Sequence, residues 1–291
     1  MNDKESKQDD PAVTELKDAD KAKQAKSQQI PKGPPRSVAR EYFESLVVTL
    51  IMALFGMTFV IQAVTVPTGS MQNTILVGDY LIVNKFIFNP NDGGLPFLPM
   101  REIRRGDIIV FKYPGNAADP NYDRIHGYTP YQLNYVKRVI GLPGERVEFK
   151  NNRVYINGEL LPEHRLIGDS SDNLSPLKTR EFESRKPEDK WDVYYSSFTM
   201  EMALAGQEVP TARWNFCVPG KPMIVPENSY FVMGDSRDQS DDGRQWGFVP
   251  RELVIGRAMF VYWSCDRAAA EDSMLGCLTH PRLRRIGHLV R

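Results

Sequence analysis

A long stretch without charge most strongly constrains how this chain can fold. No Asp, Glu, Lys or Arg occurs from Ser45 to Gly78, and Leu, Val, Ile, Met and Phe dominate the part from Leu46 to Val64. At ~1.5 Å per residue, about 20 helical residues cross a hydrocarbon core of roughly 30 Å. The apolar residues surround the whole helix instead of forming one stripe, which argues against a buried core helix. We therefore expect one transmembrane helix over residues 41–66.

The flanks of this stretch predict its orientation. A cleaved signal peptide has a short charged region and an apolar region of about 7–15 residues, whereas here about 45 mostly polar residues come first and the apolar run is longer. An uncleaved anchor fits better. Lys32, Arg36 and Arg40 precede it, and no Lys or Arg occurs between Val66 and Tyr80. The positive-inside rule then places the N-terminus in the cytosol and the bulk of the chain outside.

The sequences before and after the apolar stretch differ in composition and in pattern. Residues 1–36 are rich in Lys, Asp, Glu and Gln, so residues 1–40 are predicted to form a disordered cytosolic tail. After the stretch come short β segments separated by turn residues, which predict a mainly β fold with an antiparallel sheet. The segments are Tyr80–Val83, Asp107–Tyr113, the hairpin Arg146–Phe149 and Arg153–Ile156 around Asn151-Asn152, Tyr230–Met233 and Ile255–Trp263.

The β pattern weakens in the middle of the chain. Residues 162–226 are charged and rich in aromatic residues, and they are too numerous for a plain loop in a compact domain. We predict that they form an inserted, β-rich subdomain that divides the β domain into residues 67–161 and 227–291. The apolar run Leu95–Met100 either contacts lipid or fills the core.

The cysteines allow at most one intramolecular disulfide. They are Cys217, Cys265 and Cys277, and the last two flank a short polar loop in what would be the oxidising compartment. Closing a loop of about 13 residues would contribute roughly 3 kcal/mol. Two possibilities stay open, a Cys265–Cys277 disulfide and three unpaired thiols.

Several classes of function are not indicated. Acidic and basic residues balance at 37 each, so nucleic-acid binding is not expected. Neither a phosphate-binding glycine loop nor an H-E-x-x-H metal motif occurs, and no cofactor or metal is expected. The chain has no G-x-S-x-G, and its histidines stand in no recognisable catalytic turn; they are His126, His164, His280 and His288.

A lysine is the remaining candidate for a base beside a serine. Ser70 follows the apolar stretch directly, and Lys137 lies in an alternating apolar segment, with Val139 on the same face. Burial would lower the pKa of an inward-facing lysine and leave a neutral amine that accepts the serine proton. The alternative is that Lys137 is an ordinary surface lysine.

Three sequence blocks in order, together with the apolar stretch, resemble the bacterial type I signal peptidases, which are membrane-bound Ser-Lys proteases that remove signal peptides. The blocks are Pro67–Met71; Arg105–Phe111 with Tyr135–Gly144; and Gly234–Arg244 with Trp246–Pro250. The resemblance covers about residues 40–160 and 225–291. Two differences are modest: many relatives carry serine at Thr68 and asparagine at Ser236 and Gln239.

The resemblance implies roles for several residues. Ser70 is expected to be the nucleophile, Lys137 the general base and Ser240 the residue that orients the lysine amine. Thr68 would help the Ser70 N–H to bind the oxyanion. Asp242 and Arg244 would pair and support the site.

The resemblance also implies the substrates and the location. The substrates are expected to be secretory preproteins with small residues at −1 and −3, bound to the enzyme as an added strand. The expected location is the outer face of the bacterial cytoplasmic membrane, and the phospholipid bilayer is expected to be a second partner. Met71, Ile82 and Val139 are predicted to line the substrate pockets. Three alternatives are a Ser-Lys maturation peptidase of a conjugation or secretion system, an inactive membrane-tethered peptide-binding module, and a His-dependent secreted hydrolase.

Overall fold

The computed structural model of the protein describes residues 37–88, 100–169, 174–207, 211–212, 214–270 and 273–291. Most of the predicted tail, and the apolar run up to residue 99, lie outside these residues. The helices are α2 Val38–Phe55, α3 Pro120–His126, α4 Ser197–Leu204, α5 Gly243–Trp246 and α6 Met274–Thr279. The strands are β1 Ile61–Thr65, β2 Asp79–Asn84, β3 Ile108–Lys112, β4 Asn134–Gly141, β5 Arg146–Lys150, β6 Arg153–Ile156, β7 Glu159–Leu160, β8 Glu163–Asp169, β9 Lys178–Glu181, β10 Trp191–Tyr195, β11 Met223–Ile224, β12 Ser229–Met233, β13 Val249–Pro250 and β14 Val254–Ser264.

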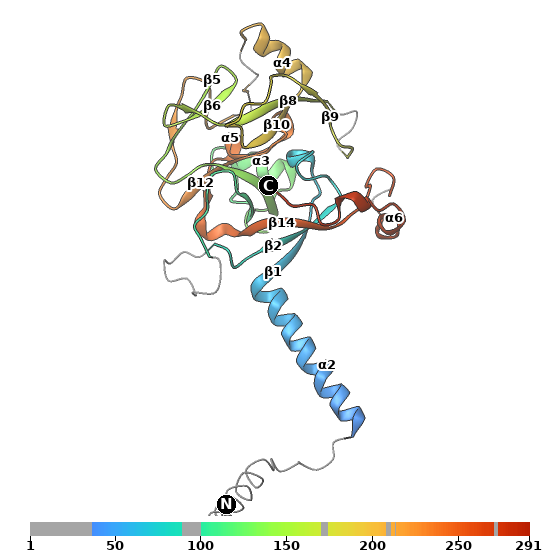
Figure 1. The fold of residues 1–291 in the computed structure, drawn as a ribbon. Coiled ribbons are helices and arrows are strands. Elements are labelled where there is room, and N and C mark those ends of the chain that lie inside the picture. Colours follow the sequence, from blue (N-terminus) through green and yellow to red (C-terminus); the bar gives the residue numbers. More distant parts are fainter. Residues whose placement is uncertain (1–36, 89–99, 170–173, 208–210, 213, 271–272) are drawn as a thin grey trace, which may run out of the picture. The chain divides into compact units, whose positions relative to one another are not determined.

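The fold is mainly β, as predicted, and most strand pairs are antiparallel. A seven-stranded sheet has the order β1-β2-β14-β3-β4-β12-β13, and a four-stranded sheet has the order β11-β5-β6-β7. The third sheet, β10-β8-β9, contains the parallel pair β8 and β10. Figure 1 shows this small sheet beside α4, and β1, β2 and β14 side by side. These elements belong to one compact unit, Phe55–Arg291.

The strands predicted from local pattern are present. Each β segment named from the sequence coincides with one strand, from β2 to β14. The predicted hairpin is formed by β5 and β6, with Glu148 opposite Tyr155. Asn151 and Asn152 turn the chain with φ of 51° and 56°, a left-handed conformation that asparagine tolerates.

The predicted transmembrane helix is wrong in its last part. Helix α2 ends at Phe55, a π-helical turn covers Gly56–Val60, and Ile61–Thr65 is strand β1. This strand pairs with β2, and its Val64 is buried in the core. An apolar run alone does not distinguish a helix from a buried strand, and here the hydrogen bonds to β2 decide for the strand.

Across the described part of the chain, no helix meets the combined length and apolarity needed to cross a membrane.

The segment predicted as an insertion contains β8, β9, β10, α4 and β11. Helix α4 begins at a Ser196 cap, whose hydroxyl accepts a hydrogen bond from the Thr199 N–H. Strand β10 contacts the third sequence block, since the Tyr194 N–H donates to the Asp235 carbonyl at 2.8 Å. This small sheet therefore braces the loop at residues 234–244. The boundaries 162 and 226 stay a prediction.

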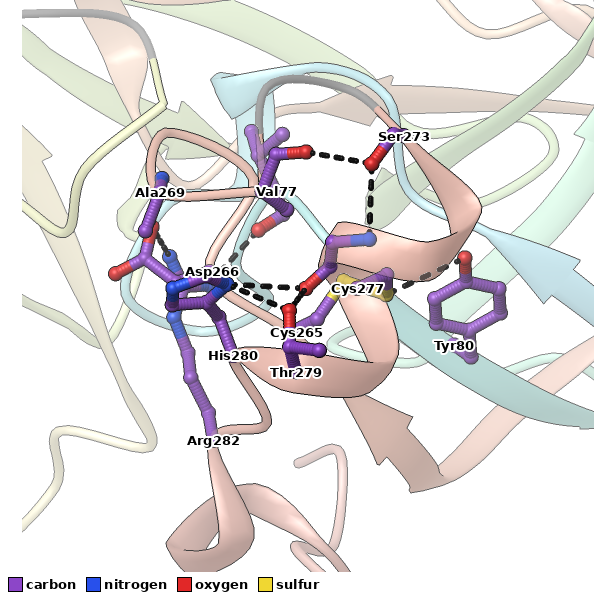
Figure 2. The surroundings of a disulfide bond; sticks show 12 residues. Val77, Tyr80, Cys265, Asp266, Ala269, Ser273, Cys277, Thr279, His280 and Arg282 are labelled. Atoms are coloured by element: carbon purple, nitrogen blue, oxygen red, sulfur yellow. Dashed lines mark hydrogen bonds and ion pairs between the residues drawn. A yellow bond between two sulfur atoms is a disulfide. The ribbon is translucent and has the colours of Figure 1, made fainter.

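Cys265 and Cys277 form a disulfide, which decides between the two possibilities left open by the sequence. Figure 2 shows that the bond joins the end of β14 to α6, where the Ser273 hydroxyl accepts from the Gly276 N–H at 2.8 Å. The Cys265 N–H donates to the Gly78 carbonyl at 3.1 Å, so the disulfide is tied to the turn before β2. Cys217 is a buried free thiol.

Two buried clusters of the large sheet position the site. One contains Met71, Ile75 and Val83 and lies against the turn that carries Ser70. The other contains Phe111 and Val139 and is completed by Val232, Trp246 and their neighbours. Strand β4 contributes Val139 to the second cluster and also carries Lys137.

Candidate active site

Ser70 lies in a short 3₁₀ turn, Gly69–Met71, between β1 and β2. Thr68 precedes the turn in an extended conformation, and Met71 follows Ser70 into the core with 1% of its surface exposed. Only 8% of Ser70 is exposed. The packing of Met71 therefore anchors the turn and leaves the serine hydroxyl at its surface.

Lys137 meets Ser70 from β4. Its Nζ donates a hydrogen bond to the Ser70 Oγ at 2.5 Å, although the residues are 67 positions apart. Lys137 is only 4% exposed, and its position opposite Ile109 in β3 fixes the backbone. The Nζ also lies 5.5 Å from the centre of the Tyr135 ring. The surface-lysine alternative is therefore wrong.

Burial sets the protonation of this lysine. Loss of solvation lowers the pKa of Lys137 to about 8, against the opposing effect of the nearby Asp242 and Asp241 carboxylates. Arg244 acts in the same direction as burial. At pH 7 about a tenth of the amine is then neutral, whereas a solvated lysine would be almost entirely charged. A neutral amine in contact with a hydroxyl can accept its proton.

Asp242 and Arg244 form the predicted pair in the third block. Both are buried, and Arg244 Nη2 lies 2.8 Å from Asp242 Oδ2. The same carboxylate accepts the Gly234 N–H at 2.9 Å, and Arg244 donates to the Arg237 carbonyl at 2.6 Å. Burial alone would raise the pKa of Asp242, but Arg244 and the Gly234 N–H hold it below its ordinary value. The pair fixes the shape of the loop.

Ser240 is near the pair Ser70 and Lys137, but the predicted hydrogen bond to the lysine amine is not formed. Its Oγ is buried and finds no hydrogen-bond partner among the described residues. Gly234 packs between the two serines: a Cβ there would lie 2.3 Å from the Ser240 Oγ and 2.4 Å from the Ser70 carbonyl oxygen. Ser240 and Lys137 line the same cleft.

The cleft has a volume of about 650 Å³ and includes Thr68, which is exposed and makes no capping hydrogen bond to the turn. Of the three predicted pocket residues, Met71 lines the cleft, whereas Ile82 and Val139 do not. Val139 is fully buried because its side chain packs in the cluster that contains Phe111 and Trp246. On β2, Ile82 lies on the face of the strand opposite to the buried Leu81 and Val83.

Several lining residues were not predicted. They are Thr65, Val66, Pro67, Gly69, Tyr128, Leu133, Asn134, Tyr135, Val136, Leu174, Asp238, Gln239 and Asp241. Tyr135 could have been found, because it is two positions from Lys137 on an alternating strand. Tyr128 could not, because it belongs to the long connection between β3 and β4.

Three other charged residues of the third block make structural contacts. Asp235 pairs with Arg138 at 2.6 Å, and Arg237 donates to Glu163 at 2.8 Å, in both cases with both partners buried. Asp238 accepts a hydrogen bond from the Ser196 N–H at 2.8 Å. These interactions connect the loop at residues 234–244 to β4 and to the small sheet.

Among the described residues, no histidine lines this cleft. His164 is buried between Asp192 and the Glu183 carbonyl, each at 2.9 Å, and His126 is exposed on α3. Within the described ranges no group of His, Cys, Asp and Glu side chains is arranged to hold a metal ion.

The family model and the sequence relatives agree on one family. The family model described as signal peptidase, peptidase S26, matches residues 39–263. Signal peptidase I of Pseudomonas aeruginosa is 32% identical over 240 residues, which cover 77% of this chain and 72% of the relative. Signal peptidase I of Aquifex aeolicus is 32% identical over 282 residues, which cover 85% of this chain and 97% of the relative. A crystal structure of a signal peptidase I from Enterococcus faecalis is 25% identical, with a TM-score of 0.29, and covers 54% of this chain and 97% of that chain.

Proposed function

The chain belongs to the peptidase S26 family of signal peptidases, and we propose that Ser70 and Lys137 carry out its reaction. It is a serine peptidase that removes signal peptides from preproteins. The observation that carries the assignment of the two residues is the 2.5 Å hydrogen bond from a buried lysine to a serine at the wall of a cleft. A Ser-Lys pair does not need a carboxylate as a third catalytic residue, because a desolvated amine is already a base near neutral pH.

The reaction proceeds in two stages. The Ser70 Oγ attacks the scissile carbonyl carbon while Lys137 takes the hydroxyl proton. The ammonium then protonates the leaving amine, which departs as the new N-terminus of the mature protein. A water molecule loses a proton to Lys137 and attacks the acyl-enzyme ester. The ammonium then returns a proton to the departing Ser70 Oγ, and the signal peptide leaves with a free C-terminal carboxyl group.

Thr68 and Ser240 have supporting roles in this proposal. The Ser70 N–H and the Thr68 hydroxyl would stabilise the oxyanion, and the exposed position of Thr68 in the cleft supports this. Ser240 would accept a hydrogen bond from the Lys137 amine when substrate engages the serine. Support for this role comes from its buried hydroxyl, which has no partner in the described part of the chain. Asp242 and Arg244 would hold the loop in place.

We propose that the substrate binds as an added strand with small residues at −1 and −3. Two segments that line the cleft support this. Strand β1, which ends at Thr65, is the terminal strand of its sheet. The part of β4 at residues 134–137 pairs with β3, whereas its pairing with β12 begins at Arg138. An extended peptide could therefore hydrogen-bond to either segment.

We also propose that the protein acts at the bacterial cytoplasmic membrane, with its N-terminus in the cytosol and the peptidase part outside. The side chains of α2 support membrane attachment, because most of the large apolar ones are more than half exposed to solvent; among them are Leu46, Val48, Leu50, Ile51, Met52, Leu54 and Phe55. Confinement of enzyme and preprotein to one surface would raise their effective concentration.

Cleavage of a purified preprotein tests the assignment. The wild type should cut after a small-x-small sequence, as read by sequencing the new N-terminus, and Ser70→Ala and Lys137→Ala should be inactive. Near-full activity of Lys137→Ala would mean that the base lies elsewhere. A wild type that cuts nothing would favour a peptide-binding module, and restriction to one substrate would favour a specialised maturation peptidase.

A further inference from the structure

We propose that residues 285–291 form a positioning segment of the active site, which holds the turn of Ser70 against the strand of Lys137. None of these seven residues is among the described residues that line the cleft, so their effect on cleavage must pass through other residues. The inference rests on the proposed function, because it assigns a support to the same two catalytic residues.

The positioning segment lies along β14. The Val261 N–H donates to the His288 carbonyl at 2.9 Å, and the Val290 N–H donates to the Met259 carbonyl at 2.9 Å. Strand β3 pairs with β14 only up to Arg257, so the segment extends the pairing of β14 beyond that point. These backbone bonds fix the place of the segment within the sheet.

Arg285 connects the positioning segment to the stretch between the Ser70 turn and β2. Its Nη2 donates to the Thr74 carbonyl at 3.2 Å and to the Asp79 carboxylate. Asp79 is fully buried and also accepts the Leu76 N–H at 2.9 Å. Because one guanidinium carries several donors, Arg285 holds both ends of this stretch at once.

Val290 supports the same turn by packing. It is 3% exposed and belongs to the buried cluster that contains Met71 and Ile75. Met71 follows Ser70 directly, and a close-packed interior transmits the loss of one side chain to its neighbours. The adjacent Leu289 side chain, by contrast, is 51% exposed. The segment therefore turns only part of its residues toward the site.

The Arg291 carbonyl contacts the lysine side of the site. It accepts a hydrogen bond from Arg138 Nη2 at 3.0 Å, and Arg138 is the neighbour of Lys137 in β4. Arg138 is 1% exposed, and it also donates to Asp235 at 2.8 Å and to the Gly106 carbonyl at 2.9 Å. Since a buried guanidinium requires acceptors for its donors, the Arg291 carbonyl helps to fix β4.

Thr74 joins the two sides. Its hydroxyl donates to Asp235 Oδ2 at 2.6 Å, and the same oxygen lies 2.6 Å from Arg138 Nη2. The contacts thus form a closed ring, whose members in order are Arg285, Thr74, Asp235, Arg138 and Arg291. The nucleophile turn and the lysine strand are both attached to this ring. A break in it would let the two catalytic side chains move apart, and a displacement of about 1 Å can cost a hundredfold in rate.

Two variants open the ring at different points. A chain that ends after Leu289 lacks the Val290 side chain and the Arg291 carbonyl, and Arg285→Gln lacks the guanidinium. For each variant, well below its melting temperature, we expect kcat for a signal-peptide substrate to fall by about tenfold, with KM within about twofold of the wild type. KM should be kept because the segment is not part of the cleft lining.

Arg284→Gln is the matched control, because Arg284 is the exposed neighbour of Arg285. We expect it to keep the wild-type kcat. Wild-type kcat in both ring variants would overturn the proposal. A raised KM with unchanged kcat would also overturn it, since the segment would then act on substrate binding.

A third variant tests the ring without removing a charge. Thr74→Val keeps the size of the side chain but cannot donate to Asp235, whereas Thr74→Ser keeps the hydroxyl. We expect kcat of Thr74→Val to fall by about three- to tenfold, and Thr74→Ser to recover most of this loss. Equal kcat for the two variants would contradict the closed ring.

Hydrogen exchange separates this inference from the proposed function, because it requires no cleavage. In the chain that ends after Leu289, the amides of residues 69–79 should exchange about tenfold faster than in the wild type, and those of the β5–β6 hairpin should not change. This result would support the segment even if no peptide is cut. Unchanged exchange at residues 69–79, or equal acceleration in the hairpin, would refute it even if Ser70→Ala is inactive.

Discussion

The backbone N–H of Ser236 donates a hydrogen bond to the carbonyl oxygen of Ser70 at 3.1 Å. The turn that carries the serine is thus held by the loop that carries Ser240 and Asp242. A second contact reinforces the first, because the Asp235 N–H donates to the Met71 sulfur at 3.4 Å. The position of Ser70 therefore depends on residues more than 160 positions later in the chain.

We expect Gly234→Ala to lower kcat/KM by roughly a hundredfold, because the new methyl group would displace the Ser70 carbonyl or the Ser240 hydroxyl, or both. A displacement of about 1 Å is enough for such a loss. Peptide cleavage measures the effect, and the melting temperature shows whether the fold survives. A variant with wild-type kcat/KM would mean that this contact does not position the nucleophile.

The cleavage rate should rise with pH through an apparent pKa near 8. Lys137 must be neutral to accept the serine proton, and its pKa of about 8 is below the ordinary 10.5. The acid limb of kcat/KM against pH measures this value. His126→Gln should leave both the limb and the rate unchanged, since His126 is exposed and absent from the described lining of the cleft. Loss of activity in that variant would support the His-dependent alternative.

Lys137→Met should abolish cleavage but raise the unfolding free energy at pH 7. Below pH 8 the native state holds a buried charge, a penalty on the order of 3 kcal/mol from a pKa change of 10.5 to about 8. Between these values the unfolded chain binds more protons, so the wild type gains stability as pH rises. The advantage of the variant should therefore vanish above about pH 10.5. Denaturant unfolding at pH 7 and 10.5 measures it, and a destabilised variant at pH 7 would contradict the argument.

Glu163→Gln should lower the unfolding free energy by about 3–5 kcal/mol, because it leaves the buried Arg237 charge without its partner. Arg146→Gln is the control, since Arg146 and Glu148 form a largely exposed pair at 3.4 Å whose loss should change stability by less than about 1 kcal/mol. Denaturant unfolding of both variants gives the comparison. Equal effects would show that burial does not set the strength of these pairs.

Replacing Cys265 and Cys277 by serine should lower the unfolding free energy by roughly 3 kcal/mol, as expected for a closed loop of about 13 residues. Alkylation of the denatured, unreduced wild type should add one label, on Cys217, and reduction should raise this to three. Cys217→Ala should keep the bond and add no label without reduction. Three labels without reduction would show that the bond is absent from the purified protein.

Local pattern predicted those parts of the fold that depend on neighbouring residues. The hairpin around Asn151 and Asn152 follows from alternation and turn chemistry, and it is present. Strand β1 was mistaken for helix because Ile61–Thr65 continues an apolar run, and only its pairing with β2 makes it a strand. Such pairing is set by tertiary structure.

Prediction of the site was limited in the same way, because its residues are brought together by tertiary structure. Ser70 and Lys137 were recognised from the order of three sequence blocks, and nothing local indicates that they meet. Val139 shares the face of Lys137 in an alternating strand, yet Val139 packs in the buried cluster with Phe111 and Trp246, whereas Lys137 lines the cleft. Asp241 was missed as a lining residue because the cleft wall that it shares with Tyr128 joins two loops distant in sequence.

The terminal position of β1 has a consequence for handling the protein. Among the described residues no strand pairs with the outer edge of β1. An unpaired sheet edge can pair with an extended chain, including another molecule of the same protein. The feature proposed to receive a preprotein is therefore also a starting point for edge-to-edge aggregation in concentrated preparations. A tight peptide inhibitor laid along β1 would occupy that edge, so it would act as a solubilising agent and a crystallisation aid as well as a block on cleavage.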